Sequence, residues 1–179
     1  MACESQNVYT SIKRCPGETI APGIRATVWF IPAADIETWP TADPAAGKLT
    51  GEFTLKEGKK WLTAKGVKSQ GGVQSDPVGE KPFKSFNVTL TVLVAGLSAG
   101  VVGFANMASN DDLVFSVQEP DGTIKVIGYE FGDVDVNPTG NTGSSSGDTV
   151  GETCAITCNM PYQPLALSGI AALGAVDEE

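Results

Sequence analysis

The chain contains no histidine. Imidazole is the usual base of serine and cysteine hydrolases and a frequent ligand of zinc, copper and haem iron, so its absence excludes the sites that depend on it. No acid and base pair and no nucleophile constellation stands out among the remaining residues. We therefore predict a protein that is not an enzyme and that needs no cofactor.

Basic residues are almost missing from the second half of the chain. Residues 85–179 hold one, Lys125, against twelve acids, whereas residues 1–84 hold the other eleven Lys and Arg against nine acids. The formal net charge is −9. Strong binding to nucleic acid needs clustered Lys and Arg, so this distribution excludes a basic footprint, and the acidic half repels DNA and anionic membranes.

Secretory and membrane signals are also lacking. The chain does not open on a basic segment followed by a hydrophobic one, which predicts synthesis and assembly inside the cell. Residues 86–110 carry no charge, but their first part alternates β-branched residues with Thr, and their second part contains three glycines. This change of period is typical of a strand that runs into a short helix, not of a membrane span.

Apolar runs bounded by Gly, Pro and Asp predict most of the secondary structure. Strands are expected at 23–31, 49–55, 61–65, 86–94, 113–117, 123–129 and 152–158. Turn signals at Glu57-Gly58 and at Pro120-Asp121-Gly122 predict hairpins. A helix is expected at 97–108, and loops at 32–47, 66–82 and 137–148, of which the second is long and mobile.

These elements indicate one domain over residues 1–179. The expected fold class is mainly β, a β-sandwich or partly closed β-barrel with one short flanking α-helix. An irregular segment at 1–22 precedes it, and an apolar extension at 163–179 follows it.

A calcium loop is suggested by oxygen ligands at alternate positions, Asp133, Asp135 and Asn137. However, Pro138 stands where the loop needs its turn glycine, and Ser144 where it needs a bidentate Glu. Acids that alternate with valines are instead typical of a solvent-facing edge strand, and we predict no metal site here.

The four cysteines can in principle form a zinc site or disulfides. They are Cys3, Cys15, Cys154 and Cys158. A zinc ribbon needs two close pairs, and only the last two are close, on a predicted strand. In a reducing compartment we expect buried free thiols.

Three tryptophans raise the question of a sugar-binding platform. Trp29 lies among the apolar residues of a predicted strand, which favours the core. Trp39 precedes Pro40, and Trp61 opens a predicted hairpin arm, so either can be an exposed contact. Because aromatic residues are enriched at protein interfaces, we favour an interface role over sugar binding.

Glycines form a stripe on or beside the predicted helix, at Gly96, Gly100 and Gly103. No phosphate-binding loop surrounds them. We predict that the bare backbone permits close packing against a sheet or a neighbouring molecule.

The order of elements resembles that of the tail tube, or major tail, proteins of long-tailed bacteriophages. The resemblance covers about residues 49–162. It is carried by a strand at 87–94, a short helix with Phe104-Ala105-Asn106, a hairpin around Asp121-Gly122, a Gly/Ser/Thr loop and a final strand reaching Pro161.

The resemblance implies a structural virion protein, assembled in the bacterial cytoplasm, whose sheets join those of neighbours in rings, usually hexameric. Stacked rings form a tube through which DNA passes without sequence-specific binding. The implied partners are copies of itself and other tail proteins, with no membrane. We expect an assembly interface at Trp61, Phe83, Gly96, Gly100 and Gly103, and an acidic lumen at Asp133 and Asp135.

An alternative function is a non-enzymatic adhesin or carbohydrate-binding module. Its β-sandwich would lie on a cell or virion surface and bind sugar through Trp39 or Trp61.

Overall fold

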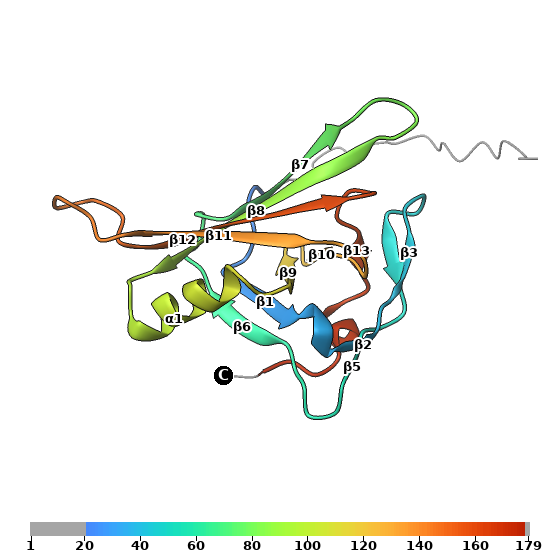
Figure 1. Ribbon diagram of the computed structural model, residues 1–179, viewed down its shortest axis with the longest axis horizontal. Coiled ribbons are helices and arrows are strands. Elements are labelled where there is room, and N and C mark those ends of the chain that lie inside the picture. Colours follow the sequence, from blue (N-terminus) through green and yellow to red (C-terminus); the bar gives the residue numbers. More distant parts are fainter. Residues whose placement is uncertain (1–20, 178–179) are drawn as a thin grey trace, which may run out of the picture.

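Two sheets packed face to face form the body of the computed structural model, which describes residues 21–177 (Figure 1). Sheet I has four strands, in spatial order β11 (Val134–Asn141), β12 (Gly151–Met160), β8 (Ser85–Ala95) and β7 (Gly72–Val78). Sheet II has seven, in spatial order β3 (Thr41–Asp43), β4 (Lys48–Thr50), β13 (Ala166–Leu167), β10 (Ile124–Ile127), β9 (Leu113–Gln118), β1 (Thr27–Pro32) and β6 (Leu62–Lys65). The predicted mainly β, sandwich-like fold is confirmed, and neither sheet closes into a barrel.

The remaining elements connect or cover the sheets. They are the paired strands β2 (Ile36–Thr38) and β5 (Thr54–Leu55), the 3-10 turns η1 (Ala33–Asp35) and η2 (Ile170–Leu173), and the helix α1 (Ala99–Ala108). α1 is the flanking helix that the sequence predicts.

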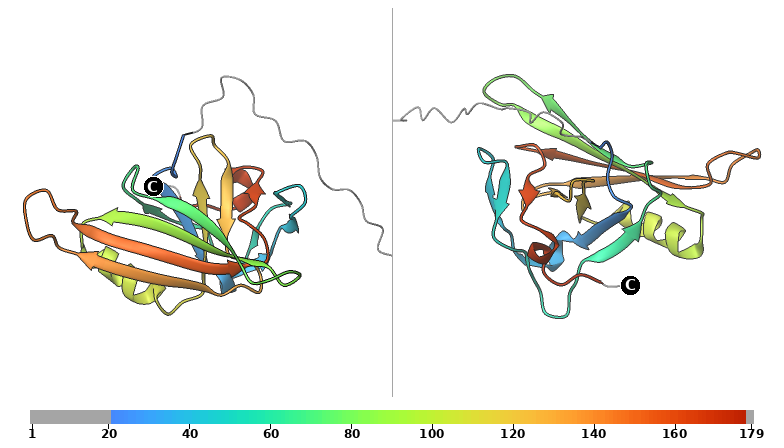
Figure 2. Two further views of the ribbon diagram at one scale, coloured as in Figure 1. Left: turned by 90° about the horizontal axis from the view of Figure 1, so that it is seen from above. Right: turned by 180° about the vertical axis from the view of Figure 1, so that it is seen from behind.

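α1 closes one end of the sandwich. Ser98 caps it by accepting a hydrogen bond from the Val101 N–H (3.4 Å). Its inner face buries Ala105 and sets the Phe104 ring against Phe30 of β1, with centroids 4.9 Å apart. β3 and β4 lie at the opposite end (Figures 1 and 2).

The central strand β9 is buried on both faces, and the only polar residue among its buried positions is Ser116. Leu113, Phe115 and Val117 belong to the core between the sheets, together with Leu90 of β8 and Ile156 of β12. Val114 instead belongs to a second core on the far side of sheet II.

The second core is completed by the C-terminal segment, which the sequence suggested to be an apolar extension. Leu167, Ala172 and Leu173 are buried there, and β13 pairs with both β10 and β4. This segment therefore packs as part of the fold.

The predicted hairpin of 49–55 and 61–65 is wrong. A turn does occur at Gly58 (φ 73°), but the arms separate: β5 pairs with β2, and β6 pairs with β1. Strand β1 pairs with β6 over four residues in register. Non-local pairing overrides the turn signal here.

The predicted loops are partly wrong as well. Segment 66–82 contains β7, which pairs with β8 over seven residues, and segment 137–148 contains the second half of β11. Segment 32–47 contains the short strands β2 and β3. Pro77 and Pro138 argue against strands locally, but both lie in edge strands, where proline is tolerated because its missing donor faces away from the ladder.

Candidate functional site

Trp61, expected at an interface, lies in the second core. Its side chain is 0% exposed, and its indole Nε1–H donates a hydrogen bond to the Leu173 carbonyl oxygen (2.9 Å). The Phe53 ring packs edge-on, with centroids 5.4 Å apart. The C-terminal segment covers Trp61 and is held there by a second hydrogen bond, which the backbone N–H of Trp61 donates to the Ala175 carbonyl oxygen. The prediction of an exposed contact at Trp61, for a protein or a sugar, is therefore wrong.

Phe83 stands at the tip of the β7–β8 hairpin and is 84% exposed. The tip is a defined turn, because the Phe83 N–H donates to the Glu80 carbonyl (2.7 Å). Gly79 has a φ of 83°, and a Cβ there would come within 2.9 Å of the Phe83 carbonyl oxygen. The hairpin extends beyond the body of the sandwich (Figure 1). A large apolar side chain held in solvent on such a tip suits contact with a partner.

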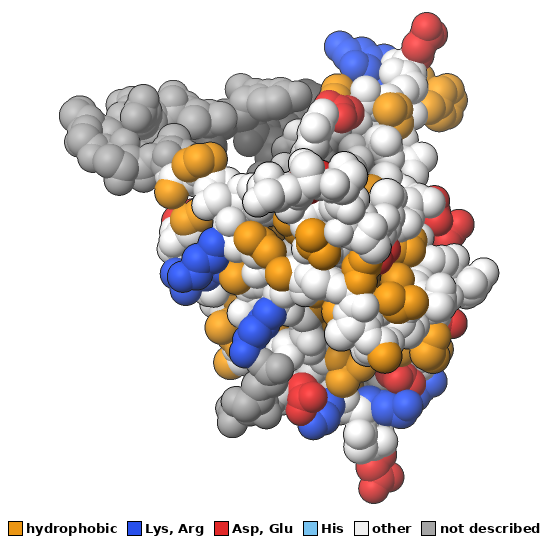
Figure 3. Space-filling view, turned by 90° about the vertical axis from the view of Figure 1, so that its left-hand side faces the viewer, with side chains coloured by type: hydrophobic (Ala, Val, Ile, Leu, Met, Phe, Trp, Pro, Cys, Tyr) orange, Lys and Arg blue, Asp and Glu red, His pale blue; other side chains and the backbone are white. Residues whose placement is uncertain are grey.

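The outer face of α1 is uncharged and mainly apolar. Met107 is 68% exposed, and Val102 is exposed beside it. Apart from its chain neighbours and the backbone of α1 itself, nothing in the described residues lies within 4 Å of a Cβ built at Gly103, so the expected close packing does not occur inside the chain. Figure 3 views this end of the molecule, where hydrophobic and uncharged side chains occupy the centre and most charges lie near the margin.

The other two glycines of the expected stripe differ from each other. Gly100 is exposed to solvent, with only the Ser98 Oγ within 4 Å of a Cβ, and it lines a small cavity between α1 and the sheets together with Phe104 and Phe30. Gly96 precedes the helix with a φ of 79°, so it serves the turn from β8. Contact of Gly96, Gly100 or Gly103 with a neighbouring molecule stays a prediction.

Both edges of sheet I are open. Within residues 21–177, no strand pairs with the outer side of β7 or of β11. In contrast, the start of β6 at one edge of sheet II is covered by the C-terminal segment, through a bridge of Trp61 with Val176. Unpaired backbone donors and acceptors therefore line sheet I along two sides.

The outer face of sheet I is polar and lacks cations. Cross-strand registers align Asp135, Thr157, Thr89 and Gln74 in one row and Asn137, Ala155, Thr91 and Gly72 in the next. No Lys or Arg occurs in β7, β8, β11 or β12. Figure 2, left, shows this sheet in front of the rest of the molecule.

The acids of the expected lumen lie at the β11 edge of this face. Asp135 is exposed and accepts a hydrogen bond from Asn137 Nδ2 (2.8 Å), while Val134 and Val136 are buried. Asp133 is exposed immediately before β11. The edge-strand interpretation of this segment is thus confirmed, whereas a lumen position of the two acids stays a prediction.

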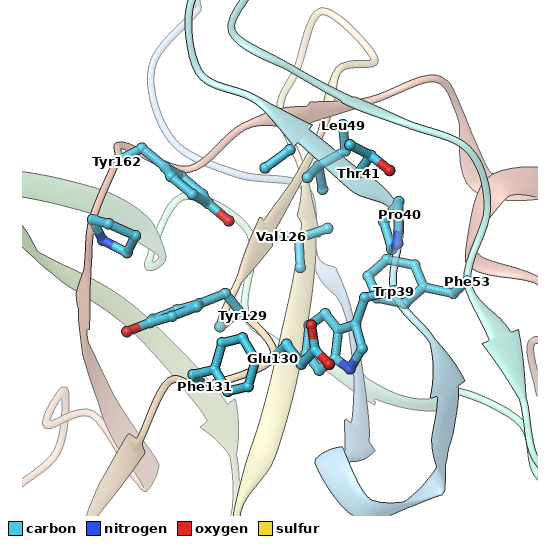
Figure 4. Close-up of a pocket in the computed structure, with 13 residues that line it drawn as sticks. Trp39, Pro40, Thr41, Leu49, Phe53, Val126, Tyr129, Glu130, Phe131 and Tyr162 are labelled. Atoms are coloured by element: carbon cyan, nitrogen blue, oxygen red, sulfur yellow. The ribbon is translucent and has the colours of Figure 1, made fainter. Parts of the chain in front are cut away.

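An aromatic pocket lies at the end of the sandwich opposite α1. It has a volume of about 430 Å³ and lies beyond the carboxyl end of β12, between that end and the β3–β4 hairpin. In Figure 4, Tyr129 and Tyr162 form one side and Trp39 and Phe53 the other, with Val126 between them. The ring centroids are 6.4 Å apart in the tyrosine pair and 5.5 Å apart in the second pair.

The pocket has one charged lining residue and one strongly exposed one. Glu130 is the charged residue, and within the described part of the chain its carboxylate has no ion pair. Phe131 is 83% exposed. Burial raises the pKa of Tyr162, and the nearby Tyr129 adds to the effect.

Of the pocket residues, sequence reasoning singled out Trp39 alone, as an exposed contact. It is half-buried and lines the cavity, while Trp29 lies in the core as predicted. The other rings come from segments far apart in the chain, so no local pattern could have grouped them.

Cys154 and Cys158 are buried free thiols, as predicted. Burial raises the pKa of each to about 11, and the carboxylates of Glu152 and Asp133 add to the effect on Cys154 and Cys158 respectively. Cys3 and Cys15 lie outside the described residues. Within residues 21–177, no three His, Cys, Asp or Glu side chains are grouped so as to hold a metal ion.

Comparisons of the chain with protein-family models, with curated proteins and with solved structures found no match. None of the helices in the described part of the chain has the length and apolar character needed to span a membrane. Function must therefore be inferred from the surfaces of the molecule itself.

Proposed function

We propose that the protein is a structural subunit that associates head to tail through the open edges of sheet I, forming rings that stack into a tube of the phage tail-tube type. The observation that carries the proposal is the pair of unpaired edges, β7 and β11, within the described residues. Open edges are a liability for an isolated domain, and pairing with a neighbour's strand satisfies them.

The strand directions of sheet I suit a closed ring. Its three ladders are all antiparallel, so β7 and β11, at the two ends of a row of four strands, run in opposite directions. A rotation that brings β11 of one copy beside β7 of the next therefore creates another antiparallel pair. With an odd number of strands, the same rotation would bring parallel edges together.

The outer face of sheet I supports a role in DNA passage. Its inner face packs against sheet II, so only the Thr- and Asn-rich face is available to line a central bore. Each contact between a cation and a phosphate would add affinity and slow the passage of DNA. The four strands contain no such cation, and Asp135 adds negative charge.

The proposal is tested by light scattering and negative-stain electron microscopy of the purified full chain. We expect rings with a central hole, and tubes as the concentration rises. A chain that stays monomeric at high concentration would contradict the proposal, and so would rings that bind DNA tightly with a steep salt dependence.

An edge variant links assembly to β7. N–H groups two residues apart in a strand point the same way, so the Ser75 N–H faces the same side as the Pro77 nitrogen, away from β8. Ser75 Oγ is buried without a hydrogen-bond partner, so the loss of this hydroxyl breaks no bond. Ser75→Pro should keep the monomer's circular dichroism spectrum and lose assembly, whereas Gln74→Ala on the outer face should assemble normally.

A second candidate function is sugar binding in the aromatic pocket. The favouring observation is the set of rings around a cavity of about 430 Å³, with Trp39 among them. Glycan-array binding that is lost in Trp39→Ala, by a protein that is monomeric, would support this function over assembly.

A further inference from the structure

The β7–β8 tip combines an exposed aromatic ring with two cations. Its residues Lys81, Pro82, Phe83 and Lys84 follow one another, with Phe83 84% exposed. Neither lysine has an ion pair within the described residues. The turn that carries them is fixed by the Phe83 N–H bond to Glu80 and by Gly79. This is a knob whose shape is set before any contact is made.

The aromatic pocket offers the complementary chemistry. Its rings provide faces for a phenyl ring, a proline or a lysine methylene chain. Glu130 provides an unpaired carboxylate at the same site, and Phe131 is 83% exposed. The knob is cationic and the pocket has one anionic lining residue, so the two surfaces match in charge as well as in apolar character.

The knob does not occupy the pocket of its own chain, because Phe83 is 84% exposed and none of the knob residues lines the pocket. Both lie at the same end of sheet I, because Val78 pairs with Ser85 there, and Phe86 with Met160. However, the knob extends from the β7 edge, whereas Tyr129, Glu130 and Phe131 precede the opposite edge strand, β11. β8 and β12 lie between them. This separation favours an occupant from another molecule.

A ring joined through the edges of sheet I places a knob beside each pocket. The carboxyl end of β7 continues into the knob, and the amino end of β11 continues from the pocket. In an antiparallel pair of β7 with a neighbour's β11, these two ends meet. We propose that the Lys81–Lys84 knob of one copy inserts Phe83 into the aromatic pocket of the next copy, with Glu130 pairing with the knob's lysines. This inference rests on the proposed function and identifies its lateral contact.

Photo-crosslinking tests the position of the contact. The full chain is prepared with benzoylphenylalanine in place of Phe83, assembled, irradiated, and digested for mass spectrometry. We expect crosslinks between two copies, from position 83 to pocket residues such as Tyr129, Phe131 or Tyr162. Crosslinks between copies at any other site, for instance on α1, would overturn the inference while leaving ring formation intact.

Substitutions test the energetics of the contact by sedimentation velocity. Phe83→Ala should weaken association at least about 30-fold, as expected for a central aromatic anchor. Glu130→Lys should weaken association, and combining it with Lys81→Glu and Lys84→Glu should restore it in part. Lys68→Glu is the matched control. It makes the same charge change as Lys81→Glu, but it lies before the amino end of β7, away from the knob, and it should have little effect.

The outcomes separate the inference from the proposed function. Rings with unchanged association in Phe83→Ala and Glu130→Lys contradict only the knob-in-pocket contact. A chain that never forms rings contradicts both. A glycan that protects the pocket residues in a monomeric chain also overturns the contact, because the pocket then serves another ligand.

Discussion

Replacing Trp61 by Phe should destabilise the folded monomer. The substitution keeps an aromatic ring but removes the indole N–H, which leaves the Leu173 carbonyl without its buried donor. An unsatisfied buried acceptor costs about 1–3 kcal/mol, and the cavity left by the smaller ring adds about 1 kcal/mol. We therefore expect a loss of about 2–4 kcal/mol, a large share of the roughly 5–15 kcal/mol that stabilises a typical domain.

Urea denaturation followed by far-ultraviolet circular dichroism measures this loss, at protein concentrations low enough to keep the chain monomeric. The midpoint should fall without a change in slope. Trp39→Phe is the control, because Trp39 is half-buried and its indole makes no hydrogen bond within the described residues, so we expect a change below about 1 kcal/mol. If the two variants proved equally stable, the placement of Trp61 in the core would be wrong.

Three further predictions concern other parts of the fold. Gly103→Ala should raise monomer stability by about 0.5–1 kcal/mol, because its new methyl group meets open space on a helix. Gly151→Ala should destabilise the monomer in the same urea assay, because its Cβ would come within 2.3 Å of the Val94 carbonyl oxygen. Hydrogen bonds from the N–H and hydroxyl groups of Ser144 and Ser145 lower the pKa of Asp148 from 3.8 to about 2. The order of this loop should therefore persist above pH 3.8 and be lost as the pH falls towards 2. Amide chemical shifts of Ser144 and Ser145 that stay unchanged in an NMR titration over that range would contradict this. The raised pKa of about 11 should keep the thiols of Cys154 and Cys158 protonated. Iodoacetamide at pH 8 should therefore label them slowly in the native chain and rapidly in urea. Equal labelling of their peptides in both conditions would show that they are not buried.

Elements with a strong local pattern could be predicted from the sequence. The alternation of Val and Leu with Thr in β8 has a period of two, and the Asp121-Gly122 turn allows β9 and β10 to pair over a short distance. α1 is indicated by the change from the strand period of two to the helical period of about 3.6 after Gly96. In each case, the information lies within about a dozen neighbouring residues.

Elements that depend on a distant partner could not be predicted. β7 is rich in polar residues and contains Pro77, and it is a strand because β8 offers it a ladder. β6 leaves its expected hairpin partner for β1. Trp61 has the same local context as an exposed residue, and only the returning C-terminal segment buries it.

The candidate surfaces divide in the same way. The alternation of Asp135 with buried valines follows from local sequence and agrees with the structure, whereas the exposure of Phe83 at a hairpin tip is seen only in the structure. The pocket joins Trp39, Phe53, Tyr129 and Tyr162 from four separate segments. Its existence depends on where β3, β4 and the ends of β11 and β12 meet, which is a property of the packed sheets.

The sequence by itself determined the β class, the α-helix that follows β8, the lack of histidine chemistry and the confinement of all but one cation to the first half of the chain. Composition and short-range period express these properties directly. Only the tertiary structure decided which strands pair, which edges stay open, that Trp61 is buried and that five aromatic rings gather opposite α1. The physical reason is that hydrogen-bonding partners and burial are set by contacts between segments far apart in the chain, for which a local pattern carries no signal.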